Sequence, residues 1–318
     1  MLLSRTFDLN FKSKISLSTG TNHTDQQNPL AGIGWMLLTG ILFVSVTGIV
    51  RHLGSALPAI EMAFIRYAFG ILLVAPTLLM LIKIPPSLKL VQFFAIRGFL
   101  HASGVCLWFY AMARIPIAEV TAIGYVAPIF VTVGAALFLG EKLHARRIIS
   151  VIVGFLGALV ILRPGFQEIN SGQLAQLCAA PIFAASFLMA KRMTDNQDTV
   201  VIVAMLTVFC TVALMPGALY YWQSPTPHEI GWLFFAALSA TCGHYTLTRA
   251  FKAAPITVTQ PLSFLQLVWA TLLGVTLFNE AVNIYVILGG GIVVASVTYI
   301  SHREAKTARL NSKRQKYD

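Results

Sequence analysis

Charged side chains are scarce in this sequence. Only 11% of its 318 residues are Asp, Glu, Lys or Arg, against about a quarter in an average soluble domain, while 57% are hydrophobic and the mean hydropathy is +0.74. The net charge of +11 would suggest nucleic acid if the basic residues formed a patch, but they stand singly between apolar runs. The composition therefore argues against a nucleic-acid partner and predicts a protein embedded in the lipid bilayer.

Catalytic and metal-binding patterns are also missing. All four cysteines lie inside apolar runs without C-x-x-C or Cys/His ligand spacing, which favours buried small hydrophobes over metal or disulfide chemistry. The patterns H-E-x-x-H and G-x-S-x-G do not occur. We therefore expect that the protein is not an enzyme and uses neither a metal nor a cofactor.

What the chain does have is long apolar stretches. Ten of them span about 18 to 23 residues each, enough to cross a bilayer as helices. Their apolar residues do not alternate with polar ones as in barrel strands. The links between them are short, and the polar tails 1–31 and 301–318 are expected to be disordered, without a signal peptide at the start. The fold class is thus an all-α membrane protein with ten transmembrane helices. They are expected near 32–50, 59–81, 90–112, 117–139, 145–162, 172–190, 199–220, 229–251, 256–278 and 282–300.

The orientation follows from the distribution of Lys and Arg. Assigning the links alternately to two sides gives 17 basic residues on the side of both tails and 3 on the other, with three arginines inside helices. Basic links stay in the cytoplasm. Both termini are therefore expected to be cytoplasmic, as an even number of spans requires.

The two halves of the chain are related by a constant offset. At 139 residues, Pro116 pairs with Pro255, Thr132 with Thr271, and Glu141 with Glu280. Each half holds five helices, and an odd number forces the second copy to enter the membrane in the opposite sense. Inversion also explains why the basic residues around Glu141 are absent around Glu280. We expect two inverted five-helix repeats, at 32–163 and 172–300.

Two segments carry a resemblance to a known family. "AMARIPIAEVTAIGYVAPIFVTVGAALFLGEKL" and "AFKAAPITVTQPLSFLQLVWATLLGVTLFNEAV" resemble the two EamA repeats of the drug/metabolite transporter superfamily. In this family a helix opens after a short proline-containing link and ends in a Gly-Glu or Asn-Glu turn. Asn279-Glu280 departs from the more typical glycine, with a minor effect expected on the loop. The resemblance covers about residues 32–300.

The resemblance implies a carrier in the inner membrane. Its central cavity would lie between the halves and serve a small organic metabolite by alternating access. Uptake of a cofactor-type or amino-acid-like solute, such as riboflavin, S-adenosylmethionine or an amino acid, is the first expectation. The alternative is efflux of a drug, metabolite or amino acid. Neither the coupling ion nor the oligomeric state is encoded visibly.

Two expected helices present matching polar and aromatic faces. Residues spaced at i, i+4, i+7 and i+11 share one side of a helix. Such a face can line a cavity, or it can pack against another helix, with Thr and Gln as interhelical hydrogen-bonding groups. The first face consists of Thr121, Tyr125, Pro128 and Thr132, and its repeat mate of Gln260, Phe264, Leu267 and Thr271.

The helix at 90–112 carries a second stripe with the same spacing, formed by Arg97, His101, Gly104 and Trp108. Arg97 either extends to the headgroups or holds a substrate carboxylate. The helix at 229–251 offers His244 and Tyr245 to the same cavity. The expected spans contain no Asp, so His101 and His244 are the groups available for proton coupling.

Other charged residues favour structural roles. Glu141 and Glu280 are expected to cap the helices that follow them, with gating as the alternative. Glu61 and Glu119 lie near helix ends, where water reaches them. Arg66 lies about 10 Å inside the surface by the helical rise, and we expect it to pair across helices or with backbone carbonyls.

Overall fold

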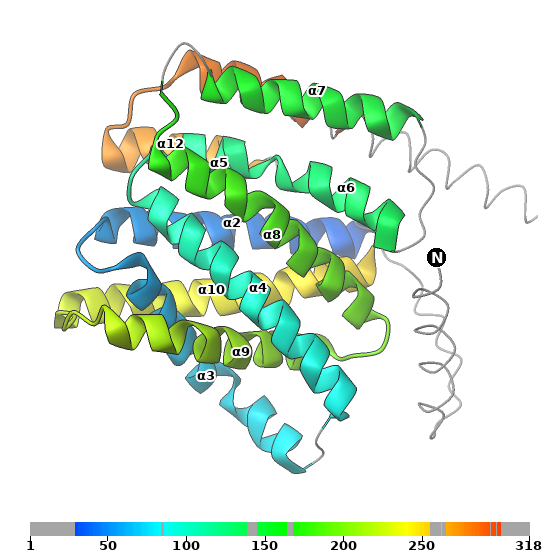
Figure 1. Ribbon diagram of the computed structural model, residues 1–318, viewed down its shortest axis with the longest axis vertical. Coiled ribbons are helices and arrows are strands. Elements are labelled where there is room, and N and C mark those ends of the chain that lie inside the picture. Colours follow the sequence, from blue (N-terminus) through cyan, green and yellow to red (C-terminus); the bar gives the residue numbers. More distant parts are fainter. Residues whose placement is uncertain are drawn as a thin grey trace, which may run out of the picture.

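The protein is a bundle of helices lying side by side. The computed structural model describes residues 29–83, 86–138, 145–163, 168–254, 262, 265–292, 294–296 and 298–299, and these contain no strand. Apart from α5 and α6, which follow one another along the same line, successive helices run in opposite directions, so that their links fall at two opposite ends of the bundle (Figure 1). The helices are α2 (Pro29–Leu53), α3 (Ala59–Lys83), α4 (Leu88–Met112), α5 (Ile117–Gly124), α6 (Ala127–Phe138), α7 (Ala145–Leu162), α8 (Ser171–Thr194), α9 (Thr199–Tyr220), α10 (Pro227–Ala253) and α12 (Leu265–Phe278).

Five of the described helices are long and apolar enough to cross a bilayer, namely α2, α3, α4, α8 and α9. Shorter apolar helical segments are α12 and the run Ile284–Ser296. Many large apolar side chains on the outside of the bundle, such as Leu72, Leu79 and Leu277, are more than half exposed. Such a surface suits lipid and not water. The structure therefore supports a membrane-embedded, all-helical fold, with five clear spans among the described residues.

The single helix expected over 117–139 is in fact two helices. α5 ends at Gly124, and α6 begins at Ala127 after a turn at Tyr125 and Val126. In this turn the amides of Tyr125 and Val126 bond the carbonyls three residues earlier, Ala122 and Ile123. Pro128 has no N–H to offer the carbonyl of Gly124, so the regular i to i−4 ladder cannot continue through this point.

Contacts between the two halves come in exchanged pairs. α2 packs on α10, and α4 packs on α8, which is the same contact with the roles of the halves reversed. Likewise α3 touches α10 while α9 touches α4, and α12 touches α2 while α5 and α6 touch α8. α3 and α9, which hold the same place in each half, pack on each other. The helices therefore follow a two-fold pattern that interlocks the halves.

Glycines bring helices of the two halves close together. A Cβ on Gly98 of α4 would stand 2.2 Å from the Cβ of Phe209 on α9. A Cβ on Gly243 of α10 would stand 2.7 Å from the Phe43 ring on α2. Real Cβ atoms do not make contacts this short, so glycine sets the separation of these helices. Phe43, in the second contact, also lines the cavity between the halves.

Candidate functional site

A cavity opens between the two halves of the bundle. Its empty space is about 1120 Å³ when the open mouth is counted with the interior. The first half supplies its walls from α2, α3, α4, α5 and the start of α6, and the second half from α8, α10 and α12. Its polar and aromatic lining residues include Thr39, Phe43, Arg66, His101, Trp108, Thr121, Tyr125, Gln176, Phe183, His244 and Gln266.

Two histidines from different halves meet in this cavity. The rings of His101 on α4 and His244 on α10 have centroids 5.0 Å apart in an edge-on arrangement. His101 Nδ1 lies 3.0 Å from the hydroxyl oxygen of Ser186 on α8, which fixes the orientation of its ring. Phe183 and Phe43 meet His101 and His244 edge-on, respectively. The structure therefore brings together two of the residues expected at the site.

Three further expected residues also line the cavity. Trp108 comes from α4, Thr121 from α5, and Tyr125 from the turn between α5 and α6. The Thr121 hydroxyl donates to the carbonyl of Ile117 at 2.8 Å, which leaves its methyl group and the oxygen lone pairs for the cavity.

Two of the expected residues lie elsewhere. Arg97 is buried, but its guanidinium donates to the carbonyls of Ser186 (3.3 Å) and Ile202 (3.4 Å) outside the cavity lining. Tyr245 packs against Trp35, with ring centroids 6.4 Å apart, and so faces away from His244. Consecutive residues on a helix point about 100° apart, which separates the two side chains. Gln260 and Phe264 lie outside the described residues.

The cavity also contains polar groups that were not expected there. Arg66 on α3 lines it, although the sequence suggested only a structural role. Gln176 on α8 lines it as well, and its side-chain oxygen is buried without a hydrogen-bond partner. The sequence did contain a signal that Arg66 could line a cavity. It is an arginine well inside an apolar helix, with no acidic residue three or four positions away. Nothing in the sequence pattern distinguished Gln176.

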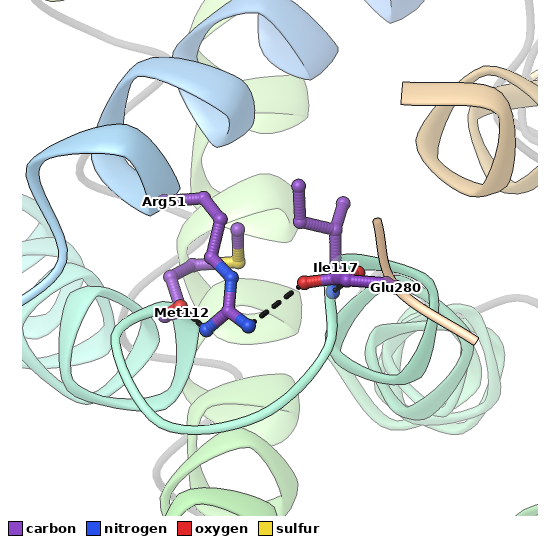
Figure 2. A network of polar contacts seen from close by, with 4 residues as sticks. All are labelled: Arg51, Met112, Ile117 and Glu280. Carbon is purple, nitrogen blue, oxygen red and sulfur yellow. Dashed lines mark hydrogen bonds and ion pairs between the residues drawn. The ribbon is translucent and has the colours of Figure 1, made fainter. Parts of the chain in front are cut away.

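At one end of the bundle a polar network joins the two halves (Figure 2). Glu280, which follows α12, lies 2.8 Å from Arg51 at the end of α2, and it accepts the amide N–H of Ile117 at the start of α5 at 2.9 Å. Arg51 also donates to the carbonyl of Met112 at the end of α4, at 3.2 Å. Glu280 was expected to cap the helix that follows it, but it caps α5 of the other half.

A helical bundle with a lipid-facing surface and a mixed polar and aromatic cavity between two interlocked halves defines the class as a membrane transport protein. The chain matches the EamA-like transporter family twice, over residues 30–163 and 170–302, and it belongs to this family. It is therefore a transporter and not an enzyme.

Named relatives cover nearly the whole chain. The riboflavin transporter of Vibrio cholerae is 30% identical over 89% of this chain and 97% of the relative. The S-adenosylmethionine uptake transporter of Rickettsia bellii is 28% identical over 86% and 94%. The pseudopaline exporter CntI of Pseudomonas aeruginosa is 26% identical over 85% and 96%. A solved crystal structure, 19% identical, has a TM-score of 0.58 and covers 86% of this chain and 97% of the other, which shows a shared fold.

Proposed function

We propose that this protein is an inner-membrane secondary carrier with ten spans and both termini in the cytoplasm. It moves a small organic metabolite through the cavity by alternating access between two inverted repeats. The alternation of helix directions (Figure 1) and the exchanged contacts between the halves support this topology. The basic residues of the links, concentrated on the side of both tails, support the orientation.

The observation that carries the proposal is the composition of the cavity wall. Side chains from both halves form it, and they combine hydrogen-bonding groups with aromatic rings. Groups of this kind inside a membrane protein are costly unless they serve a solute or an aqueous path. His101 and His244, Trp108, Thr121 and Tyr125 are the residues that we assign to the substrate.

The proposed direction is uptake of a cofactor-type or amino-acid-like solute. The relative named as an S-adenosylmethionine uptake transporter supports this direction, and the one named as a riboflavin transporter supports a cofactor-type solute. The alternative is efflux, which the relative named as an exporter supports. Right-side-out and inside-out vesicles separate the two, because a carrier for uptake accumulates solute against its gradient only in the first.

The test is to block the cavity and compare the result with a matched change on the outside. Thr121→Trp fills space in the cavity, whereas Thr276→Trp places the same ring on the exposed face of α12. Both threonine hydroxyls donate to the carbonyl four residues earlier, so the local helix loses the same bond in each variant. We expect proteoliposome uptake of riboflavin or S-adenosylmethionine to be lost only in Thr121→Trp. Equal uptake by both variants would remove the cavity from the transport path.

A further inference from the structure

Arg66 is a buried cation with no anionic partner in the part of the chain that the structure describes. Its side chain is 5% exposed and lines the cavity. Its Nε has no hydrogen-bond partner, and its guanidinium carbon lies 4.0 Å from the centroid of the neighbouring Tyr67 ring. The buried Tyr67 hydroxyl lies near enough to interact with this guanidinium and with the Cys210 thiol. A cation–π contact on one side leaves the donors at the edge of the guanidinium available.

The acids of the described residues are occupied elsewhere. Glu61, five residues before Arg66, accepts the amide N–H of Gln223 at 2.9 Å. Glu119 accepts from the Gln173 side chain, and Glu280 binds Arg51. The others are Glu168, Asp195 and Asp198, which are exposed in links, and Glu229, which caps α10. No Asp or Glu appears among the described residues that line the cavity.

A second buried arginine adds to the positive charge. Arg97 stands behind the cavity wall, and its partners are neutral carbonyls. Both Arg66 and Arg97 act electrostatically on His101 and His244. An unpaired cation is costly to remove from water, and a planar oxyanion that accepts two hydrogen bonds from the guanidinium offsets this cost best.

The cavity also offers polar and apolar contacts for the rest of a ligand. The unpartnered amide oxygen of Gln176 can accept one hydrogen bond from a ligand N–H or O–H group. Trp108, Phe43 and Phe183 provide aromatic surface. These contacts suit a flat organic body attached to the charged group.

We propose that the transported solute carries an oxyanion, a carboxylate or a phosphate, which Arg66 binds within the cavity. The inference rests on the proposed carrier function and names the substrate class of the same site. Arg66 is then a specificity-determining residue. Solutes that lack the oxyanion leave a buried guanidinium unpaired and are transported less well.

The experiment uses the full chain in proteoliposomes and three pairs of labelled solutes. In each pair only the first member carries an oxyanion: riboflavin 5′-phosphate and riboflavin, S-adenosylmethionine and methylthioadenosine, and indole-3-acetate and indole-3-acetamide. Initial uptake is measured for the wild type, Arg66→Met, Arg66→Lys and Arg249→Met. Arg249 is the control because it is an exposed arginine of α10 outside the cavity lining, over the Trp35 ring.

For at least one pair, we expect the wild type and Arg249→Met to take up the solute with the oxyanion about tenfold faster than its partner, or more. A difference of this size corresponds to one charge-assisted hydrogen bond. Arg66→Met should lose that preference. Arg66→Lys keeps the charge without the planar fork and should retain only part of it. If Arg66→Met does not fold, Arg66→Lys still tests whether Arg66 selects solutes with an oxyanion.

Two results would overturn the inference while the carrier function stands: wild-type uptake without preference for the oxyanion, or an unchanged preference in the Arg66 variants. Wild-type vesicles that take up none of the six solutes would overturn the proposed function itself.

Discussion

Arg51 and Glu280 form an ion pair between the two halves, with 2.8 Å separating Nη2 from Oε1 (Figure 2). The contact is close but is not an aligned hydrogen bond. At the opposite end, Lys191 donates to the carbonyl of Phe251 at 2.9 Å, as Arg51 does to that of Met112. Phe251 follows Met112 by the repeat offset of 139 residues. A hydrogen bond from a basic side chain to a backbone carbonyl thus occurs at both ends of the bundle.

The ion pair predicts a gate on the side that the proposed topology places outside the cell. Glu280→Gln keeps an oxygen for the Ile117 amide but removes the charge that holds Arg51. We expect cavity opening to become easier by about 1 kcal/mol, within the range for a partly exposed pair. A cysteine at position 121 should then react several-fold faster with an external, membrane-impermeant maleimide.

The matched control for the gate is Glu229→Gln, which alters a carboxylate that caps α10 without joining the halves. Its effect on labelling at position 121 should be negligible. An unchanged labelling rate in Glu280→Gln would mean that the ion pair is only structural.

The histidine pair predicts the coupling of uptake to a proton. The charged and titratable groups that face His101 and His244 are Arg66 from α3, Arg97 from α4 and each other. A bound oxyanion offsets the arginine charge, so that a proton can enter with the solute. We expect an inward pH gradient to stimulate wild-type uptake but not uptake by His101→Gln. His228→Gln, at the exposed start of α10, should respond like the wild type. A preserved response in His101→Gln would discard the coupling role.

Much of the fold was predictable because apolar length and turn residues are local signals. The expected helices at 90–112 and 199–220 agree closely with α4 and α9. The division at Tyr125 was not predicted because a proline such as Pro128 inside an apolar run favours a kink, which does not by itself say that the helix ends.

The site was only partly predictable, since it depends on which helix faces meet. Polarity inside a span identified His101 and His244, but the same criterion selected Tyr245, which the helical step turns toward Trp35. Arg66 was assigned a structural role because its partners could not be known from its own helix. Only the packed halves show that the acids are engaged elsewhere.

The inverted topology predicts which links face outward. Ser55 and Ser224, in the links after α2 and α9, are exposed and should share the external side. Ser87 and Asn196, in the links before α4 and α9, are exposed and should be cytoplasmic. The side on which each link lies can be measured with single cysteines at these positions in a cysteine-free background, labelled on intact cells with a membrane-impermeant reagent. Labelling of all four without permeabilisation would contradict the inversion.

The close approach of α4 and α9 predicts a large difference between two glycine substitutions. In Gly98→Ala the new methyl group collides with the Phe209 backbone and Cβ, so the helices must separate. Overpacking of this kind costs about 1–3 kcal/mol. Gly231→Ala adds a methyl group where no atom lies within 4 Å and should gain slightly from helix propensity. Thermal unfolding in detergent measures both changes. Because Gly98 adjoins Arg97 and lies one turn from His101, Gly98→Ala should also weaken solute uptake. Equal melting temperatures of the two variants would show that α4 and α9 are not held together at this contact.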